Sequence, residues 1–297
     1  MAEPLTRSKA QEARVAARPG HIVPIEEGDL PDVGAFLARH FGAKRSLEQW
    51  QQAITPTWCP ESDHGYLLRA DDGRIGGVIV LFRAQRQIDG ERRRTCSLSS
   101  WLVLPEFRDD SIQLLVHATR DDDVVYVNFT PAPRTVRIFE RLGFQRIDTT
   151  EWVVANVPLP WGQTLSNHAA IATHLTGAAH DDLAAHAGYR RLHHVGLWAE
   201  NGDFCHVAFV QGRFHLIPAA RVIYASDWAV FQRVLKFFRG AALLRFGLLL
   251  TMIEQRRLAG RPAFAVAQAA QQLALFRGTD IVAGAIDGLY SELVTFA

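Results

Sequence analysis

Cysteine is scarce in this chain of 297 residues, which has three, at positions 59, 96 and 205. Their odd number, wide spacing and lack of any CxxC pair argue against a disulfide framework and against a structural zinc site. The histidines at 168, 174, 180 and 186 recur every six residues, a spacing that spreads them around a helix instead of gathering them on one face. We therefore expect no metal ion.

An excess of charge of one sign is also missing, because 32 basic residues stand against 31 acidic residues. No global field then selects nucleic acid or an anionic membrane as a partner. Residues 246–253 form the most apolar stretch, which is far shorter than the roughly 20 residues that span a bilayer. Residues 1–19 carry basic side chains without an apolar segment, unlike a secretory signal. We expect a flexible tail at 1–19 and a cytoplasmic protein with no nucleic-acid or membrane partner.

Hydrophobic residues, by contrast, make up 48% of the chain and charged residues 21%, a composition that can bury a large core. The length suits two domains of ordinary size. A cluster of proline and glycine at 158–162 interrupts the pattern of strands and helices. We place a domain boundary there, between a first domain at 20–157 and a second at 158–297.

The first half alternates strand and helix patterns. It opens with a strand at 22–25 and a helix from Leu30, for which Asp29 is the expected cap. Turn-forming residues at 71–74 and 89–90 predict hairpins. Further strands are expected at 66–70, 75–82, 96–104, 124–129 and 146–157, and further helices at 111–119 and up to a closing glycine at Gly143. This order predicts a mixed sheet of the α/β class in which strands 96–104 and 124–129 run parallel.

The second half partly repeats that order. A hairpin is expected at 194–200 and 204–210 about Asn201-Gly202. It is followed by a strand at 221–225, a helix at 227–239 with Ser226 as its cap, and a strand at 248–253. The repeat predicts a companion half in which strands 221–225 and 248–253 form the equivalent parallel pair.

Two segments of the first half carry a family resemblance. Residues 103–115 read VLPEFRDDSIQLL, which is similar to a strand and loop written V-x-P-x-[YF]-R-G-x-G-[IL]-[GA]-x-x-L. Residues 128–131 read NFTP and residues 137–144 read RIFERLGF, similar to N-x-x-A followed by Y-x-x-L-G-F. Together they resemble acyl-CoA N-acyltransferases of the GNAT superfamily, with a GNAT-like fold in the first half and a degenerate one in the second.

The resemblance implies that acetyl-CoA or another acyl-CoA is the substrate. In the family the strand splays from its parallel neighbour and its free backbone groups hold the pantetheine arm, while the following helix start holds the pyrophosphate. The residues so implicated are Leu102, Val103, Leu104, Arg108, Asp109, Asp110, Ser111, Ile112, Gln113, Asn128 and Arg134.

The phosphate loop departs from the family pattern. It has lost all of the pattern's glycines, so side chains stand where phosphate usually rests. The alternative is that Asp110 or Ser111 simply caps a helix that binds no ligand. Arg134 shares a helical face with Arg137 and Arg141, and that face meets either the nucleotide or only solvent.

The acid and base of catalysis are less evident. The family commonly has a proton-donating tyrosine where this chain has Phe139, so Tyr126 is the candidate acid, with Thr130 as a substitute. The alternative for Tyr126 is simple packing. Residues 96–104 contain no carboxylate or histidine. This leaves Glu106, more simply explained as an exposed charge, or a water held by backbone carbonyls or by Ser99 and Ser100.

The resulting hypothesis is direct transfer of an acyl group, acetyl first, from acyl-CoA to a small-molecule or peptide amine. No covalent enzyme intermediate is needed, so the missing Ser-His or Cys-His pair is no objection. The alternative is a non-catalytic CoA-binding or scaffold protein that keeps the fold. In either case the second half is free to form the acceptor pocket or a lid, and the fold alone does not choose between these functions.

Overall fold

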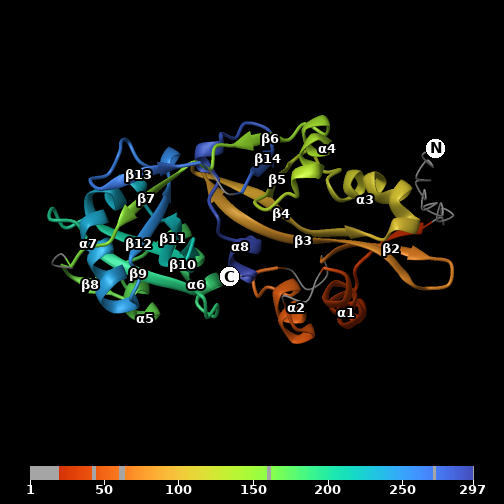
Figure 1. Cartoon of the computed structure of the whole chain (residues 1–297), viewed down its shortest axis with the longest axis horizontal. Coiled ribbons are helices and arrows are strands. Elements are labelled where there is room, and N and C mark those ends of the chain that lie inside the picture. Colours follow the sequence, from red (N-terminus) through yellow and green to blue (C-terminus); the bar gives the residue numbers. More distant parts are fainter. Residues whose placement is uncertain (1–19, 42–44, 60–63, 159–161, 270–271, 297) are drawn as a thin grey trace, which may run out of the picture.

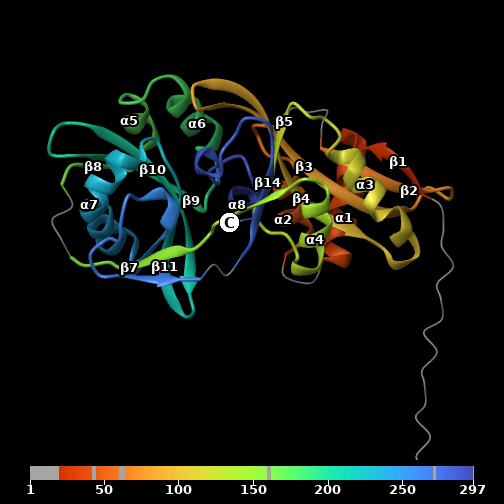
Figure 2. The same cartoon turned by 90° about the horizontal axis from the view of Figure 1, so that it is seen from above.

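The computed structural model describes residues 20–41, 45–59, 64–158, 162–269 and 272–296. The tail expected at 1–19 lies outside these residues, as does the centre of the cluster at 158–162. Within the described part of the chain the strands form two mixed sheets of seven. Figures 1 and 2 show the two sheets side by side, with the C-terminal segment between them.

The first sheet has the strand order β1-β2-β3-β4-β5-β14-β6. Its strands are β1 (Gly20–Pro24), β2 (Gly65–Ala70), β3 (Ile75–Ile88), β4 (Glu91–Val103), β5 (Val124–Asn128), β6 (Gln145–Ile147) and β14 (Ala274–Arg277). Helices α1 (Leu30–His40) and α2 (Leu47–Ile54) cover one face, and α3 (Ser111–Ala118) and α4 (Val136–Arg141) cover the other (Figure 1). The predicted hairpins and the predicted parallel pairing of β4 with β5 are confirmed.

The second sheet has the order β13-β7-β12-β11-β10-β9-β8. Its strands are β7 (Glu151–Ala155), β8 (Thr164–Leu165), β9 (Leu192–Trp198), β10 (Phe204–Phe214), β11 (Ile217–Ala225), β12 (Leu250–Glu254) and β13 (Ala265–Gln268). Helices α5 (His168–Ala172), α6 (Gly177–His186) and α7 (Trp228–Phe246) belong to this half, and α8 (Glu292–Thr295) ends the described chain. The predicted parallel pair is confirmed, since β11 pairs with β12 from Ala219 to Arg221.

The two halves exchange a strand. The single strand predicted at 146–157 is wrong: it is two strands, and β6 lies in the first sheet whereas β7 lies in the second, between β12 and β13. In return β14, from near the end of the chain, lies between β5 and β6. Each half therefore completes the sheet of the other, and the domain division at 158 remains a prediction.

Alternating side chains place two cores on the first sheet. Leu68, Ile79 and Leu81 pack toward α3 and α4, whereas Val78 and Val80 pack toward α1 and α2. The second sheet packs α7 on one face and the C-terminal segment 289–294 on the other. No helix of the described residues is long and apolar enough to cross a bilayer.

Two predicted helix caps are wrong. Asp29 does not cap α1 with its side chain, because its carboxylate accepts from the Glu26 amide and from Arg69 at 2.6 Å. Helix α7 is capped one residue later than expected, by Asp227, which accepts from the Val230 amide at 2.9 Å. The helix also continues past Arg239 to Phe246 and ends at Gly247, whose φ of 67° suits glycine.

Candidate functional site

The site begins where the parallel strands β4 and β5 stop pairing. Their ladder runs from Arg94 opposite Val124 to Ser97 opposite Val127. Beyond Ser97, β4 continues to Val103 along β3 alone. The two strands therefore splay apart as predicted, which frees backbone groups on the facing edges.

A β-bulge interrupts β4 within the splayed stretch. Val78 lies opposite Leu102 and Val80 opposite Ser99, so Ile79 of β3 faces two residues, Ser100 and Trp101. Ser100 has a φ of 48°, a left-handed conformation that costs a residue with a Cβ roughly 1–2 kcal/mol. Bulges and such conformations re-aim backbone and side-chain groups and concentrate at functional sites.

Glu292 lies at the vertex between the splayed strands. Its Oε2 accepts from the Ser97 hydroxyl of β4 at 2.6 Å, and its Oε1 accepts from the Phe129 amide at 2.9 Å and from the Thr130 hydroxyl at 3.1 Å. The residue is 3% exposed, and this burial raises the pKa of its carboxyl group. A carboxylate from the end of the chain thus occupies the point where the β4–β5 ladder ends.

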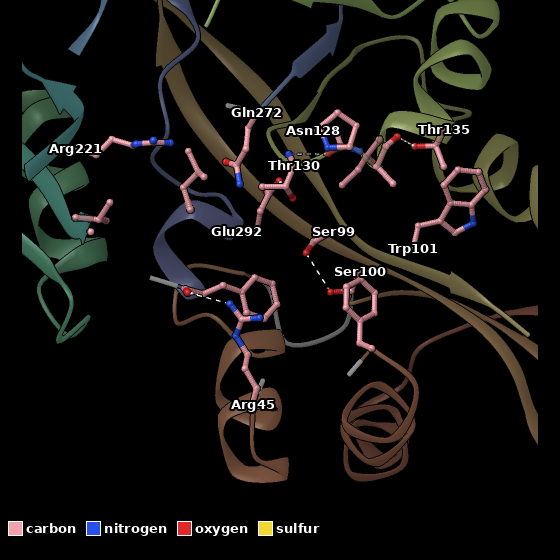
Figure 3. A pocket seen from close by; sticks show the side chains of 18 of the residues that line it. Arg45, Ser99, Ser100, Trp101, Asn128, Thr130, Thr135, Arg221, Gln272 and Glu292 are labelled. Carbon is pink, nitrogen blue, oxygen red and sulfur yellow. Dashed lines mark hydrogen bonds between the residues drawn. The ribbon is translucent and has the colours of Figure 1, made fainter. Parts of the chain in front are cut away.

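A cavity of about 510 Å³ opens at this vertex. Figure 3 shows Glu292, Thr130 and Asn128 on one side of it, and the serine pair Ser99 and Ser100, whose hydroxyl oxygens are 3.3 Å apart, below them. Its other walls come from β4 and α4, from α2 and the segment before it, from the second sheet, from the residue Gln272 before β14 and from the C-terminal segment. These walls include Arg45, Trp50, Trp101, Phe139, Arg213, Arg221, Met252, Gln272 and Phe296.

The predicted cofactor residues lie mainly outside this cavity. Asn128 lines it, and its Oδ1 accepts from the Thr130 amide at 3.1 Å. Leu102 and Val103 pair with β3 at the far end of β4, and the Leu104 amide donates to the Gly76 carbonyl. Arg134 is exposed in the 3-10 turn Pro133–Thr135, which precedes α4.

The predicted phosphate loop is a 3-10 helix, Pro105–Asp110, that runs directly into α3. It contains Arg108 and Asp109, both exposed, and it precedes Ile112 and Gln113, which are exposed on α3. The Ser111 amide donates to the Arg108 carbonyl. The loop's part in binding CoA therefore remains a prediction.

Asp110 turns toward β1 instead of capping α3. Its side chain makes no capping hydrogen bond to the helix, and its Oδ2 accepts from the Gly20 amide at 3.2 Å. The carboxylate is thus engaged with a backbone group of the first strand.

The candidate acid Tyr126 is fully buried. The Asp121 amide donates to its hydroxyl at 3.3 Å, and its ring packs in the core with Phe144 and beneath the Arg277 guanidinium. Burial raises the pKa of Tyr126 to about 12. Its catalytic role remains a prediction. Glu106, the other sequence candidate, follows Pro105 in the 3-10 helix rather than at the vertex.

Sequence reasoning missed Glu292 and the cavity walls that Arg45 and the second half supply. Glu292 is 195 residues from Ser97 along the chain, and no motif marks it. The described residues contain no group of three or more potential ligands arranged to hold a metal ion.

Comparison with known proteins identifies the fold. No family model and no curated protein matches the sequence. A GCN5-related N-acetyltransferase from Kribbella flavida has a similar structure, with a TM-score of 0.60, 16% identity and coverage of 89% of this chain and 72% of that one. A GCN5-related N-acetyltransferase from Anabaena variabilis is also similar, with a TM-score of 0.59, 13% identity and coverage of 86% of this chain and 72% of that one. The chain has the GNAT fold.

A third solved structure is similar over both halves of the chain. It is the N-myristoyltransferase of Saccharomyces cerevisiae with bound myristoyl-CoA, with a TM-score of 0.50, 9% identity and coverage of 93% of this chain and 82% of that one. At these identities the likeness concerns the GNAT fold alone. The likeness therefore extends over both sheets of this chain.

Proposed function

We propose that this GNAT-fold chain is an N-acyltransferase that moves an acyl group directly from acyl-CoA to a primary amine. The observation that carries the proposal is the buried carboxylate of Glu292 at the vertex of the splayed strands, joined to the cavity through the Thr130 hydroxyl at 3.1 Å. A buried carboxylate with a raised pKa is a suitable proton acceptor, because its basicity lies closer to neutral pH.

The acyl-CoA would enter along the splayed strands. The unpaired edge of β4 beyond Ser97 offers backbone groups to the pantetheine arm, which carries amides able to pair with them. The bulge at Ser100 and Trp101 re-aims backbone groups where the thioester carbonyl would lie, and a donor placed there stabilises the developing oxyanion. The start of α3, at 110–113, remains our proposed seat for the phosphates.

The reaction would proceed in one displacement. The amine nitrogen attacks the thioester carbon and forms the C–N bond, while its surplus proton passes to the Thr130 oxygen as the Thr130 proton passes to Glu292. The C–S bond then breaks and CoA leaves as a thiolate. The proton held by Glu292 returns through Thr130 to that sulfur. Glu292 and Thr130 together thus act as the acid that protonates the thiolate, the role of the family tyrosine at the position of Phe139.

The second half would hold the acceptor. Arg213, Ala219, Arg221 and Met252 of the second sheet line the cavity opposite the splayed strands, so an amine bound between the halves reaches the vertex. Trp101 and Phe139 meet edge to face, with centroids 5.8 Å apart, and both line the cavity beside the bulge. Their bulk favours a short acyl group, and we propose acetyl.

Two measurements test the proposal. Calorimetric titration of the protein with CoA and acetyl-CoA measures cofactor binding, and thiol release from acetyl-CoA in the presence of a panel of primary amines measures transfer. Micromolar binding with amine-dependent thiol release supports the acyltransferase. Binding without release by any amine would support the CoA-binding scaffold instead.

A further inference from the structure

Three arginines surround a second cavity beside the first. This open cavity of about 790 Å³ is lined by Arg45, which precedes α2, and by Arg190 and Arg191, which lie between α6 and β9. Arg45 and Phe296 line both cavities, so they form the wall between them. In Figure 3 the side chain of Arg45 rises from below the cavity toward the C-terminal segment.

The charge of this arginine cluster is not compensated by the described residues, none of which forms an ion pair with Arg45, Arg190 or Arg191. Arg45 donates to the Phe296 carbonyl at 3.2 Å, and its guanidinium lies 4.6 Å from the ring centroid of that residue. Burial, and next the charge of Arg191, lower the pKa of Arg45. Like charges held near each other repel unless an anion joins them.

The walls of the two cavities carry further polar residues. Thr295 lines the same cavity as the arginine cluster. Arg213 lines the first cavity, is exposed and also lacks an ion pair with any described residue. Because the net charge of the whole chain is only +1, this positive patch is a local feature.

We propose that the arginine cluster binds an anionic group, a phosphate or a carboxylate, of the acceptor amine. The inference rests on the proposed function and names its substrate class. Guanidinium groups pair with both kinds of oxyanion through two parallel hydrogen bonds. An acceptor anchored on Arg45 and Arg191 extends past Phe296 into the first cavity, where its amine meets Thr130.

Matched pairs of acceptors test this substrate class. Ethanolamine is compared with O-phosphoethanolamine, and propylamine with β-alanine, each in acetyl-CoA-dependent thiol release. We expect a higher kcat/KM for the anionic member of each pair. The pair with the larger ratio of kcat/KM shows whether the site prefers phosphate or carboxylate. The Arg191→Gln and Arg45→Gln variants should reduce the preference about tenfold, and salt should weaken it in the parent.

Exposed Arg92 provides a control, because it lies near the β3–β4 turn and lines neither cavity. Arg92→Gln should keep the full preference, and melting temperatures check that all variants fold. Equal kcat/KM for charged and neutral amines, or an unchanged preference in Arg191→Gln, overturns the inference and leaves the proposed function standing. A matching loss of CoA affinity in Arg191→Gln also overturns it, because the cluster would then serve CoA.

The failure of the proposed function gives a different result. If no amine is acylated, O-phosphoethanolamine is titrated into the protein by calorimetry. If the parent binds O-phosphoethanolamine and Arg191→Gln does not, the anion site is supported and only the transfer reaction is overturned. No binding by the parent protein overturns both.

Discussion

The substitution Glu292→Gln separates the chemistry of the vertex from its architecture. Glutamine has nearly the same shape, and its carbonyl oxygen still accepts from the Phe129 amide and the Thr130 hydroxyl. Its amide group donates to the Ser97 oxygen, which changes from donor to acceptor. All three contacts of 2.6 to 3.1 Å therefore survive, and only the proton acceptor is lost.

The magnitude follows from those contacts. Because no hydrogen bond is lost, the free energy of unfolding should change by less than about 1 kcal/mol. Glu292→Ala instead leaves the buried Phe129 amide and Ser97 hydroxyl unpaired, at about 1–3 kcal/mol each, so it should destabilise the fold by roughly 2–6 kcal/mol. The loss of a general base typically lowers kcat by about 10²–10⁴-fold, and we expect Glu292→Gln to fall in that range.

The assay combines acetyl-CoA-dependent thiol release at pH 7.5 with urea unfolding of each variant. Glu140→Gln is the control, because the carboxylate of Glu140 on α4 forms an exposed ion pair with Arg146 of β6. This variant should match the parent in both measurements. A Glu292→Gln protein that keeps kcat within tenfold of the parent would refute the role of Glu292 as base. A stability loss as large as that of Glu292→Ala would refute the structural argument.

Three further predictions concern stability and CoA. Burial lowers the pKa of His186 to about 4, and its ring accepts from the Tyr290 amide, so its neutral form stabilises the fold. This stability is fully present above about pH 6.5 and declines as the pH falls toward 4. The free energy of unfolding should fall by at most about 1.4 kcal/mol per pH unit in that window. Equal urea midpoints at pH 7.5 and 5.5 would contradict this prediction. Leu275→Ala in the exchanged strand β14 should cost about 2–5 kcal/mol and leave a single calorimetric transition, whereas two transitions would show that the halves unfold independently. Ser111→Trp should block CoA in calorimetric titration while the fold persists, and unchanged affinity would exclude the proposed phosphate seat.

Local sequence patterns predicted most elements of the fold. The turn predicted at Asp89-Gly90 is confirmed, because Asp89 and Gly90 adopt positive φ values of 51° and 80°, as a tight hairpin turn requires. Gly143 ends α4 with a φ of 85°, as its position after an apolar helix predicted. These features depend on neighbouring residues, so a short window of sequence contains the physical information that determines them.

The strand exchange and the site depend on long-range packing. Nothing near 146–157 indicates that the chain leaves one sheet at Ile147 and enters the other at Glu151, because strands of either sheet have the same local pattern. The order of elements and the GNAT-like segments at 103–115 and 128–144 thus determined the fold class, the parallel pairs and the splayed strands. Only the tertiary structure placed Glu292 against Ser97 and Arg45 beside Arg191. Such contacts join residues far apart in the chain, and they form because the completed sheets leave one buried vertex and one open cavity that those side chains line.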